Sequence, residues 1–241
     1  MLLPLNGKPL ILYTLEQAAK VRYITNVIVA TDDERIAAVV GEAGHEAVLT
    51  SPEHRSGSDR IAEVAACLPE GSIIVNVQGD EPLISPKTIE AAVQAILADD
   101  NVDIVTTSEP ITSHDDELIN FNVVKVVTND DGQALYFSRS PMPFPRAGSE
   151  RHGGPREALE AEPELFSIFR KHTGLYVYRR EYLLKFTALP QSKLEKIEML
   201  EQLRALENGA KIKVLEVDEP SISVDTAEDL ERARRIIEGN E

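Results

Sequence analysis

The segment SIIVNVQGDEP, residues 72–82, is the most informative part of the sequence. The run from Ile73 to Val77 is mostly β-branched, too short for a helix and bounded by glycine on both sides, which predicts a buried strand. The strand ends in Gln-Gly-Asp-Glu-Pro, so an amide and two carboxylates lie where the backbone leaves the sheet. In parallel α/β sheets ligands bind at this end of the strands, and a carboxylate there suits the Mg²⁺ of a nucleotide phosphate. The alternative is that Asp80 only ends the strand and Glu81 is solvated.

Composition limits the classes of partner. The 241 residues carry 41 acidic and 25 basic side chains, a net charge of -16, which argues against a nucleic acid or an anionic membrane. No stretch approaches the ~18 apolar residues of a membrane span and no signal peptide is recognisable, so we expect a cytoplasmic protein. The one cysteine, Cys67, lies in an apolar run, and we expect it to be a buried thiol.

Helices and strands alternate through the first hundred residues. The expected order is a loop and helix within 1–21, a strand at 26–30, a helix at 34–43, a strand at 46–49, a helix at 60–68, the strand at 73–77 and a helix starting at Ser85-Pro86. Short connections between alternating elements are typical of a wound, mostly parallel sheet. The predicted fold class is therefore α/β.

The pattern changes after residue 100. Strands expected at 123–128 and 134–137 flank Asn129–Gly132, a turn with hairpin chemistry, so an antiparallel element follows the strand expected at 103–107. Residues 140–163 have no period and are expected to form a long mobile loop with at most one short helix. The remaining expected elements are a strand at 172–179, one continuous helix at 194–206, a strand at 211–217 and a last helix capped by Thr226 and Asp229.

Two aspartates are candidates for a metal site. Asp80 and Asp225 each lie where an apolar strand ends, and a wound sheet places such ends at one edge. Two carboxylates there would hold one or two Mg²⁺ ions against a triphosphate. Alternatively, Asp225 only favours the dipole of the helix that follows it.

Two further groups of polar residues suit ligands. The segment His54–Arg60, HRSGSDR, would present backbone N–H groups and a guanidinium to a nucleotide, although a capped helix start gives the same pattern. Residues of the second half suit an acidic, polyhydroxylated ligand, because arginine binds carboxylates bidentately and the other side chains bond hydroxyls. They are Arg139, Arg146, His172, Tyr176, Glu201 and Gln202. The alternative is an ordinary strand histidine and a helix whose glutamates form only its solvated face.

In order and spacing, the motifs closely resemble those of the 3-deoxy-manno-octulosonate cytidylyltransferases, also called CMP-Kdo synthetases. They are IVNVQGDEPLI, the ATD after the second strand, HRSGSDR, NVVKVV followed by ALYFSRSPMP, HTGLYVYR, LEKIEMLEQLR and SVDTAEDLERAR. The resemblance covers nearly the whole chain. It implies a nucleotide-diphospho-sugar transferase-like, Rossmann-like fold with an antiparallel sugar-binding and dimerisation region. It also implies transfer of CMP from CTP to 3-deoxy-D-manno-octulosonate (Kdo), with Mg²⁺, for lipopolysaccharide biosynthesis.

The resemblance also implies roles for single residues. Asp80 and Asp225 are expected to be catalytic metal ligands, and Gln78 is expected to contact the sugar. The expected nucleotide contacts are Ala30, Asp32, Ser56, Gly57 and Arg60. The expected Kdo contacts are Arg139, Arg146, His172, Tyr176, Glu201 and Gln202. In the implied reaction the anomeric hydroxyl attacks the α-phosphorus in line, without a covalent enzyme intermediate.

The resemblance implies a single domain over residues 1–241. Its expected parts are a nucleotide-binding half at about 1–110, a sugar-binding and dimerisation half at about 111–210, and a closing strand and helix at 211–241. We expect a homodimer through the second half, also because the 194–206 helix has a wide apolar stripe.

The chain departs from the family pattern at its start. Family members begin with a strand and a loop ending in Gly-Lys that clamps the triphosphate, and Met1–Leu5 matches the segment just beyond that lysine. Lys8 belongs to a later Gly-Lys-Pro. We therefore expect the natural polypeptide to be longer, and expect poor stability and weak activity if translation begins at Met1.

Two alternatives stay open. One is a cytidylyltransferase for another acidic sugar, 8-amino-Kdo or a sialic acid. The other is a homologue that binds nucleotide or sugar without turnover, which the missing phosphate loop favours and the retained carboxylates oppose.

Overall fold

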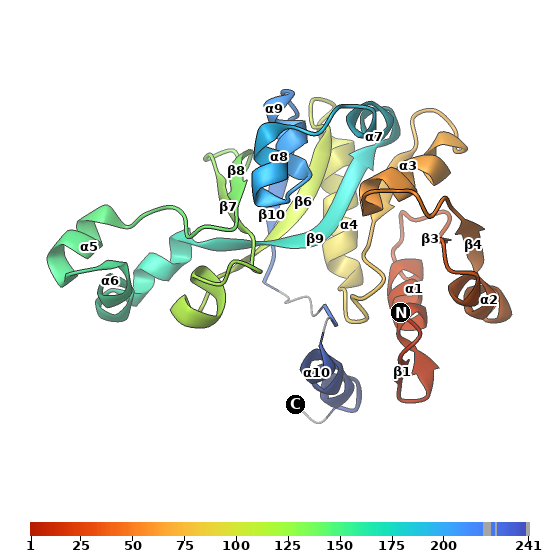
Figure 1. The fold of residues 1–241 in the computed structure, drawn as a ribbon, viewed down its shortest axis with the longest axis horizontal. Coiled ribbons are helices and arrows are strands. Elements are labelled where there is room, and N and C mark those ends of the chain that lie inside the picture. The colour runs from red at the N-terminus through yellow and green to blue at the C-terminus, as the bar shows by residue number, and fades with distance from the viewer. Residues whose placement is uncertain (219–222, 225, 240–241) are drawn as a thin grey trace. The chain divides into compact units, whose positions relative to one another are not determined.

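The computed structural model describes residues 1–218, 223–224 and 226–239, and the chain divides into two compact units (Figure 1). Unit 1 comprises Met1–Ala98, Leu175–Ala188 and Glu219–Glu241, and unit 2 comprises Asp99–Gly174 and Leu189–Asp218. Strand β9, Arg170–Arg179, begins in unit 2 and ends in unit 1. No helix of the described residues is both long and apolar enough to cross a membrane.

The described residues of unit 1 contain three separate strand pairings and the helices around them. Its elements are β1 (Pro4–Leu5), β2 (Lys8–Pro9), α1 (Leu10–Ala19), β3 (Ile28–Thr31), α2 (Glu34–Glu42), β4 (Glu46–Leu49), α3 (Gly57–Ala66), β5 (Ile73–Asn76), α4 (Pro86–Ala98), α7 (Arg180–Thr187) and α10 (Ala227–Ile237). Strands β1 and β2 are antiparallel, β3 and β4 are parallel, and β5 is antiparallel to the second half of β9. The last helix is tied to the start of the chain, because Ala233 packs in one buried cluster with Leu5 and Leu10.

Unit 2 is built on the strand order β10-β6-β9-β7-β8. Its elements are β6 (Ile104–Pro110), the π-helical turn η1 (His114–Leu118), β7 (Lys125–Thr128), β8 (Ala134–Ser138), α5 (Arg146–His152), α6 (Pro155–Ala161), the 3₁₀ turn η2 (Pro163–Ile168), the first half of β9, α8 (Lys193–Glu198), α9 (Gln202–Glu207) and β10 (Ile212–Glu216). Strands β10 and β6 are parallel, and β7 is antiparallel to both β8 and β9. The predicted hairpin around Asn129–Gly132 is confirmed.

The α/β class is confirmed, and the sheet is mixed. The strand at 73–77, which we expected in a mostly parallel sheet, has an antiparallel partner in β9. The capping box of Thr226 and Asp229 at the last helix is also present.

The expectation of a mobile loop at 140–163 is wrong. Helices α5 and α6 occupy most of it, and the left-handed Gly153, with φ of 91°, turns the chain between them. Leu159 is buried in a cluster with Ile111, Leu118 and Phe169, so contacts distant in sequence stabilise helices whose sequence has no apolar period.

Two further expectations are corrected. The helix at 194–206 is broken into α8 and α9 at Met199, which takes the left-handed conformation with φ of 54°. The apolar period continues across the break, which is why the sequence pattern suggested one helix. Cys67 is exposed rather than buried, because it follows the last turn of α3.

Candidate functional site

The turn after β5 is packed tightly onto α1. The Thr14 hydroxyl donates to the Gly79 carbonyl at 2.9 Å. A side chain at position 79 would put its Cβ 2.8 Å from Cδ1 of Ile11 and 2.9 Å from the sulfur of Met1, so any residue larger than glycine would require these side chains to shift. Gln78 donates from Nε2 to Oδ1 of Asn76 at 3.2 Å. The turn that carries Asp80 is therefore fixed from both sides.

Asp80 is half-buried, and its backbone carbonyl accepts the N–H of Val224 at 2.9 Å. Asp225 lies outside the described residues. The residue before Asp225, Val224, is bonded to the Asp80 turn, and the residue after it, Thr226, caps α10. Among the described residues no group of three or more His, Cys, Asp or Glu side chains is arranged to hold a metal ion.

The predicted nucleotide contacts gather around the start of α3 in unit 1. Arg60 donates from Nη1 to the Thr50 hydroxyl at 2.5 Å, and its Nη2 lies 3.3 Å from a carboxylate oxygen of Asp32. Ser56 is the N-cap of α3 and accepts the backbone N–H of Asp59, so the capped-helix interpretation is also correct. Ala30 lies in β3 and Gly57 is the first residue of α3.

The loop before α3 is held by Glu63. Its carboxylate accepts the backbone N–H of Ser51 at 3.1 Å and contacts the imidazole of His54. The hydrogen bond from His54 lowers the pKa of Glu63, and the bond from Ser51 adds to this effect. A hollow of about 430 Å³ borders the same loop. Its lining residues are Glu53, His54, Arg55, Asp59, Thr187 and Ala188.

Arg139, in unit 2, directly follows β8. Its Nε donates to the backbone carbonyl of Glu198 at 2.7 Å and its Nη1 to that of Phe121 at 2.9 Å. The Glu198 carboxylate binds the Arg139 backbone N–H instead of the guanidinium. The guanidinium is therefore oriented by neutral groups.

His172, in β9, is held on three sides. Its Nε2 lies 2.8 Å from the Thr106 hydroxyl, its backbone N–H donates to Val124, and its ring packs edge-on against Phe137. Burial lowers the pKa of His172 to about 3. The imidazole is consequently neutral at physiological pH, and neutral imidazole both donates and accepts hydrogen bonds.

The other predicted sugar contacts differ in setting. Tyr176 belongs to unit 1, where it is buried and pairs with Asn76 across β5 and β9. Arg146 begins α5, is exposed and pairs with Glu150 at 2.8 Å. Glu201 precedes α9, and the buried Gln202 is its first residue. The expectation of a solvated helix face is wrong for Glu195, which is buried and lies 3.3 Å from Arg204.

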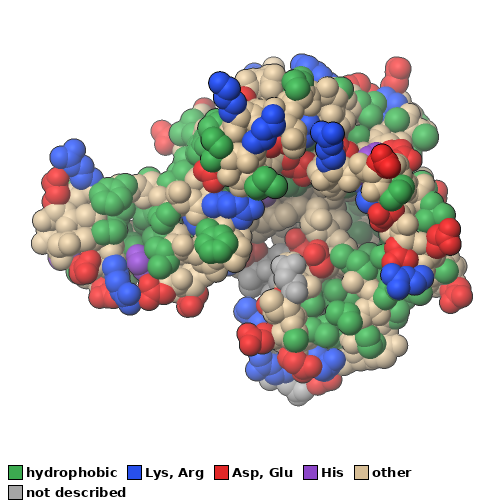
Figure 2. Space-filling model, viewed as in Figure 1, with side chains coloured by type: hydrophobic (Ala, Val, Ile, Leu, Met, Phe, Trp, Pro, Cys, Tyr) green, Lys and Arg blue, Asp and Glu red, His purple; other side chains and the backbone are tan. Residues whose placement is uncertain are grey.

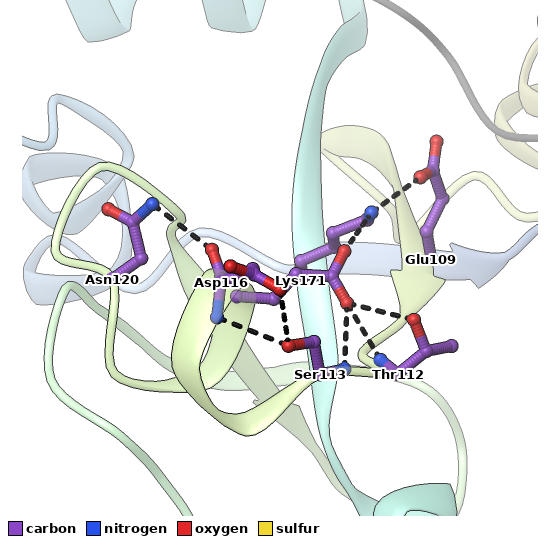
Figure 3. A network of polar contacts seen from close by, with 7 residues as sticks. Glu109, Thr112, Ser113, Asp116, Asn120 and Lys171 are labelled. Carbon is purple, nitrogen blue, oxygen red and sulfur yellow. Dashed lines mark hydrogen bonds and ion pairs between the residues drawn. The ribbon is translucent and has the colours of Figure 1, made fainter.

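A polar network in unit 2 had no counterpart in the sequence analysis (Figure 3). Lys171 lies 2.6 Å from Glu117 and 3.4 Å from the buried Glu109. The Glu117 carboxylate also accepts the backbone N–H groups of Thr112 and Ser113, which anchors η1. Burial opposes ionisation of Glu117, but these hydrogen bonds outweigh it and lower its pKa. The sequence signal for this network is weak, because its partners are 54 and more residues from Lys171 or bind through backbone atoms.

A family model, curated sequences and a solved structure all show similarity of this chain to cytidylyltransferases. A cytidylyltransferase family model matches residues 1–212. The 3-deoxy-manno-octulosonate cytidylyltransferase of Trichlorobacter lovleyi is 46% identical over 230 residues, 95% of this chain and 88% of the relative. That of Geotalea uraniireducens is 49% identical over 227 residues, 94% and 87% of the two chains.

Solved structures extend the comparison to the fold. The CMP:2-keto-3-deoxy-manno-octonic acid synthetase complexed with CTP superposes with a TM-score of 0.87 and 36% identity, covering 100% of this chain and 92% of that one. A 4-diphosphocytidyl-2C-methyl-D-erythritol synthase from Anaerococcus prevotii, 13% identical with a TM-score of 0.61, shares the fold alone.

Proposed function

This chain belongs to the cytidylyltransferase family, and we propose that it is a 3-deoxy-manno-octulosonate cytidylyltransferase that transfers CMP from CTP to Kdo and releases pyrophosphate. The observation that carries the proposal is identity of nearly one half, along almost the whole chain, to relatives with that name. Activation of Kdo in this way serves lipopolysaccharide biosynthesis.

The cation is assigned to Asp80 together with Asp225. The donor chemistry of the Asp80 turn fits Mg²⁺, because a half-buried carboxylate, whose oxygens Mg²⁺ prefers, lies in the turn that follows a strand. The bond between Val224 and Asp80 supports the pairing of the two aspartates, since it ties the chain next to position 225 to this turn. A bound divalent cation supplies charge neutralisation on the phosphate oxygens.

The nucleotide is assigned to Ala30, Asp32, Ser56, Gly57 and Arg60. The guanidinium of Arg60 is already held by Asp32 and Thr50, so little side-chain freedom is lost when it binds the nucleotide. Free backbone N–H groups at the start of the ten-residue α3 favour an electronegative partner.

The sugar contacts that we propose in unit 2 are Arg139, Arg146, His172, Glu201 and Gln202. Gln78 and Tyr176, in unit 1, are proposed as sugar contacts from the family resemblance alone. Arg139 carries the strongest argument, because carbonyl oxygens orient its guanidinium without neutralising it. Such a group binds the carboxylate of an acidic sugar by charge-assisted hydrogen bonds. The neutral imidazole of His172 suits a sugar hydroxyl.

The reaction then needs positioning rather than a protein nucleophile. The anomeric hydroxyl of Kdo gives up its proton to solvent as its oxygen forms a bond to the α-phosphorus. The bond from the α-phosphorus to the bridging oxygen of the β-phosphate breaks, and pyrophosphate leaves with that electron pair. Arginine side chains stabilise the negative charge during this displacement.

The test is pyrophosphate release from CTP and Kdo by the wild type and by Asp80→Asn. We expect the carboxamide to lower the rate at least about 100-fold, the loss typical of one electrostatic contact to the transition state. Asp130→Asn, in the exposed turn after β7, is the matched control and should leave the rate unchanged. CTP binding without turnover by the wild type would favour the binding homologue, and faster turnover of 8-amino-Kdo or a sialic acid would reassign the sugar.

We also assign a homodimer to the exposed apolar side chains of unit 2. Phe121, Leu135, Ile197 and Met199 are 68%, 61%, 79% and 75% exposed. Figure 2 shows further hydrophobic side chains at the surface of the part of unit 2 that carries α5 and α6, interspersed with charged ones. Large exposed apolar groups favour a protein interface. A monomeric mass in light scattering would contradict this assignment.

A further inference from the structure

Lys125 is fully buried and is the first residue of β7, within the otherwise apolar run from Val123 to Val127. Its ammonium donates to the backbone carbonyls of Asn120 at 2.8 Å and Val123 at 2.6 Å. Burial lowers the pKa of Lys125, and the positive charge of Arg139 lowers it further, whereas Glu198 raises it. Burial of an ammonium group costs desolvation free energy, and here only backbone carbonyls compensate for that cost. The position of Lys125 therefore calls for a functional explanation.

The two carbonyls that Lys125 binds lie on either side of Phe121, whose own carbonyl accepts from Nη1 of Arg139. Lys125 thereby closes the loop between η1 and β7 around the acceptor that orients the guanidinium. The start of the same loop is held by Asn120, which donates to the carbonyl of Asp116 in η1 (Figure 3).

Glu198 holds Arg139 from the other side. Its carboxylate accepts the Ser138 hydroxyl at 2.7 Å and the Arg139 backbone N–H at 3.0 Å, and its carbonyl accepts Nε of Arg139. Ser138 is also the direct cross-strand neighbour of Lys125 in the β7–β8 register. Lys125 and Arg139, together with Ser138 and Glu198, therefore form one connected cluster.

The bonds of this cluster leave part of the guanidinium for a ligand. Nε and one N–H of Nη1 of Arg139 have carbonyl acceptors. Within the described part of the chain, Nη2 has no acceptor and Arg139 forms no ion pair. Two cations, Lys125 and Arg139, face one carboxylate, Glu198, so the cluster keeps net positive charge. The remaining edge of Arg139 suits an anionic group.

We propose that Lys125 and Glu198 are positioning residues that hold Arg139 in the orientation which selects an acidic sugar. The inference rests on the proposed function, because it takes Arg139 as a contact of the Kdo carboxylate. Neither residue needs to touch the sugar. Both act through Arg139. Lys125 acts through the loop carbonyls, and Glu198 acts through the Ser138 hydroxyl, the Arg139 backbone N–H and Nε of Arg139.

The test compares Kdo with its C1 carboxamide, in which the carboxylate is replaced by a neutral group, in the wild type and in Lys125→Met. We expect the Kdo KM to rise about tenfold and the CTP KM to stay within about twofold. The preference for Kdo over the carboxamide should fall by a similar factor. A general loss of folding would instead impair turnover of both sugars and raise the KM for CTP to a similar extent.

The matched control is Lys213→Met. Lys213 is also a strand lysine of unit 2 that binds a loop carbonyl, that of Asp131, but it has no connection to Arg139. Glu198→Gln is the second test variant, because an amide cannot accept hydrogen bonds through both of its terminal atoms. It should show the same selective rise in the Kdo KM.

Wild-type acid preference in a folded Lys125→Met or Glu198→Gln variant would overturn the inference. So would failure of both variants to fold, since their role would then be structural. If the wild type itself does not convert CTP and Kdo, the proposed function fails first, which the same assay shows separately.

Discussion

Removal of Arg204 is the sharpest test of how the region of Glu201 and Gln202 is held. Arg204 and Glu195 are both about 5% exposed, with 3.3 Å between Nε and a carboxylate oxygen. Arg204 also donates to the carbonyl of Leu189 at 2.8 Å, and Glu195 completes the capping box of α8. Arg204 therefore joins α9 to α8 through Glu195, and to the segment before α8 through Leu189, across the break at Met199.

The variant Arg204→Met keeps much of the apolar stem and leaves the Glu195 carboxylate buried without its cation. Breaking a buried pair in this way costs about 3–5 kcal/mol. At about 2–4 °C per kcal/mol for a chain of this size, the melting temperature should fall by about 10 °C. Circular dichroism during thermal unfolding measures the shift directly.

Two controls isolate the buried charge. Arg35→Met removes the same side chain from an exposed pair with Asp33, which solvent screens, so its melting temperature should change far less. Glu195→Gln combined with Arg204→Met removes both charges but keeps a side chain able to form the capping box, and should recover most of the loss. An Arg204→Met protein as stable as Arg35→Met would refute the reasoning.

Three further expectations concern single residues. Because the folded pKa of His172 is about 3 against an unfolded value of 6.5, the unfolded state binds the proton first, and stability is lost as the pH falls below 6.5. This group alone should cost about 2 kcal/mol between pH 7 and pH 5, and urea titrations of His172→Asn should lack that part of the slope; an unchanged slope would show the imidazole is not buried as described. Arg60→Met should raise the KM for CTP about tenfold with the KM for Kdo unchanged, as expected for one charge-assisted contact, and equal effects on both substrates would place Arg60 outside the nucleotide site. Met199→Gly should stabilise the protein by up to about 1 kcal/mol in urea unfolding, since glycine adopts the left-handed conformation without strain; destabilisation would mean that the side chain contributes packing.

Much of the order of elements could be predicted because local signals and tertiary structure agree. The strand at 46–49 has its predicted bounds, and the capping pair of Thr226 and Asp229 starts the last helix. Helices α5 and α6 could not be predicted, because the burial of Leu159 depends on Ile111, Leu118 and Phe169, which lie elsewhere in the sequence. Likewise, nothing local marks Met199 as left-handed.

The candidate site likewise has features that the sequence predicts and features that it does not. The turn with Asp80 is visible in the sequence as a strand followed by Gly-Asp, and the contact between Asp32 and Arg60 joins two members of the proposed nucleotide set. Lys125 and Glu198 were missed because their partners are mostly backbone groups, which no sequence pattern identifies. The sequence signal for the role of Lys125 is a lysine flanked by valines in an apolar run.

The most direct test of the central claim follows the α-phosphate. CTP labelled at that position is incubated with Kdo, Mg²⁺ and either the wild type or Asp80→Asn. We expect the wild type to move the label into CMP-Kdo, and the variant to keep its fold but transfer almost none. Label that stays in CTP with the wild type, or reaches CMP-Kdo equally fast with the variant, would contradict this expectation.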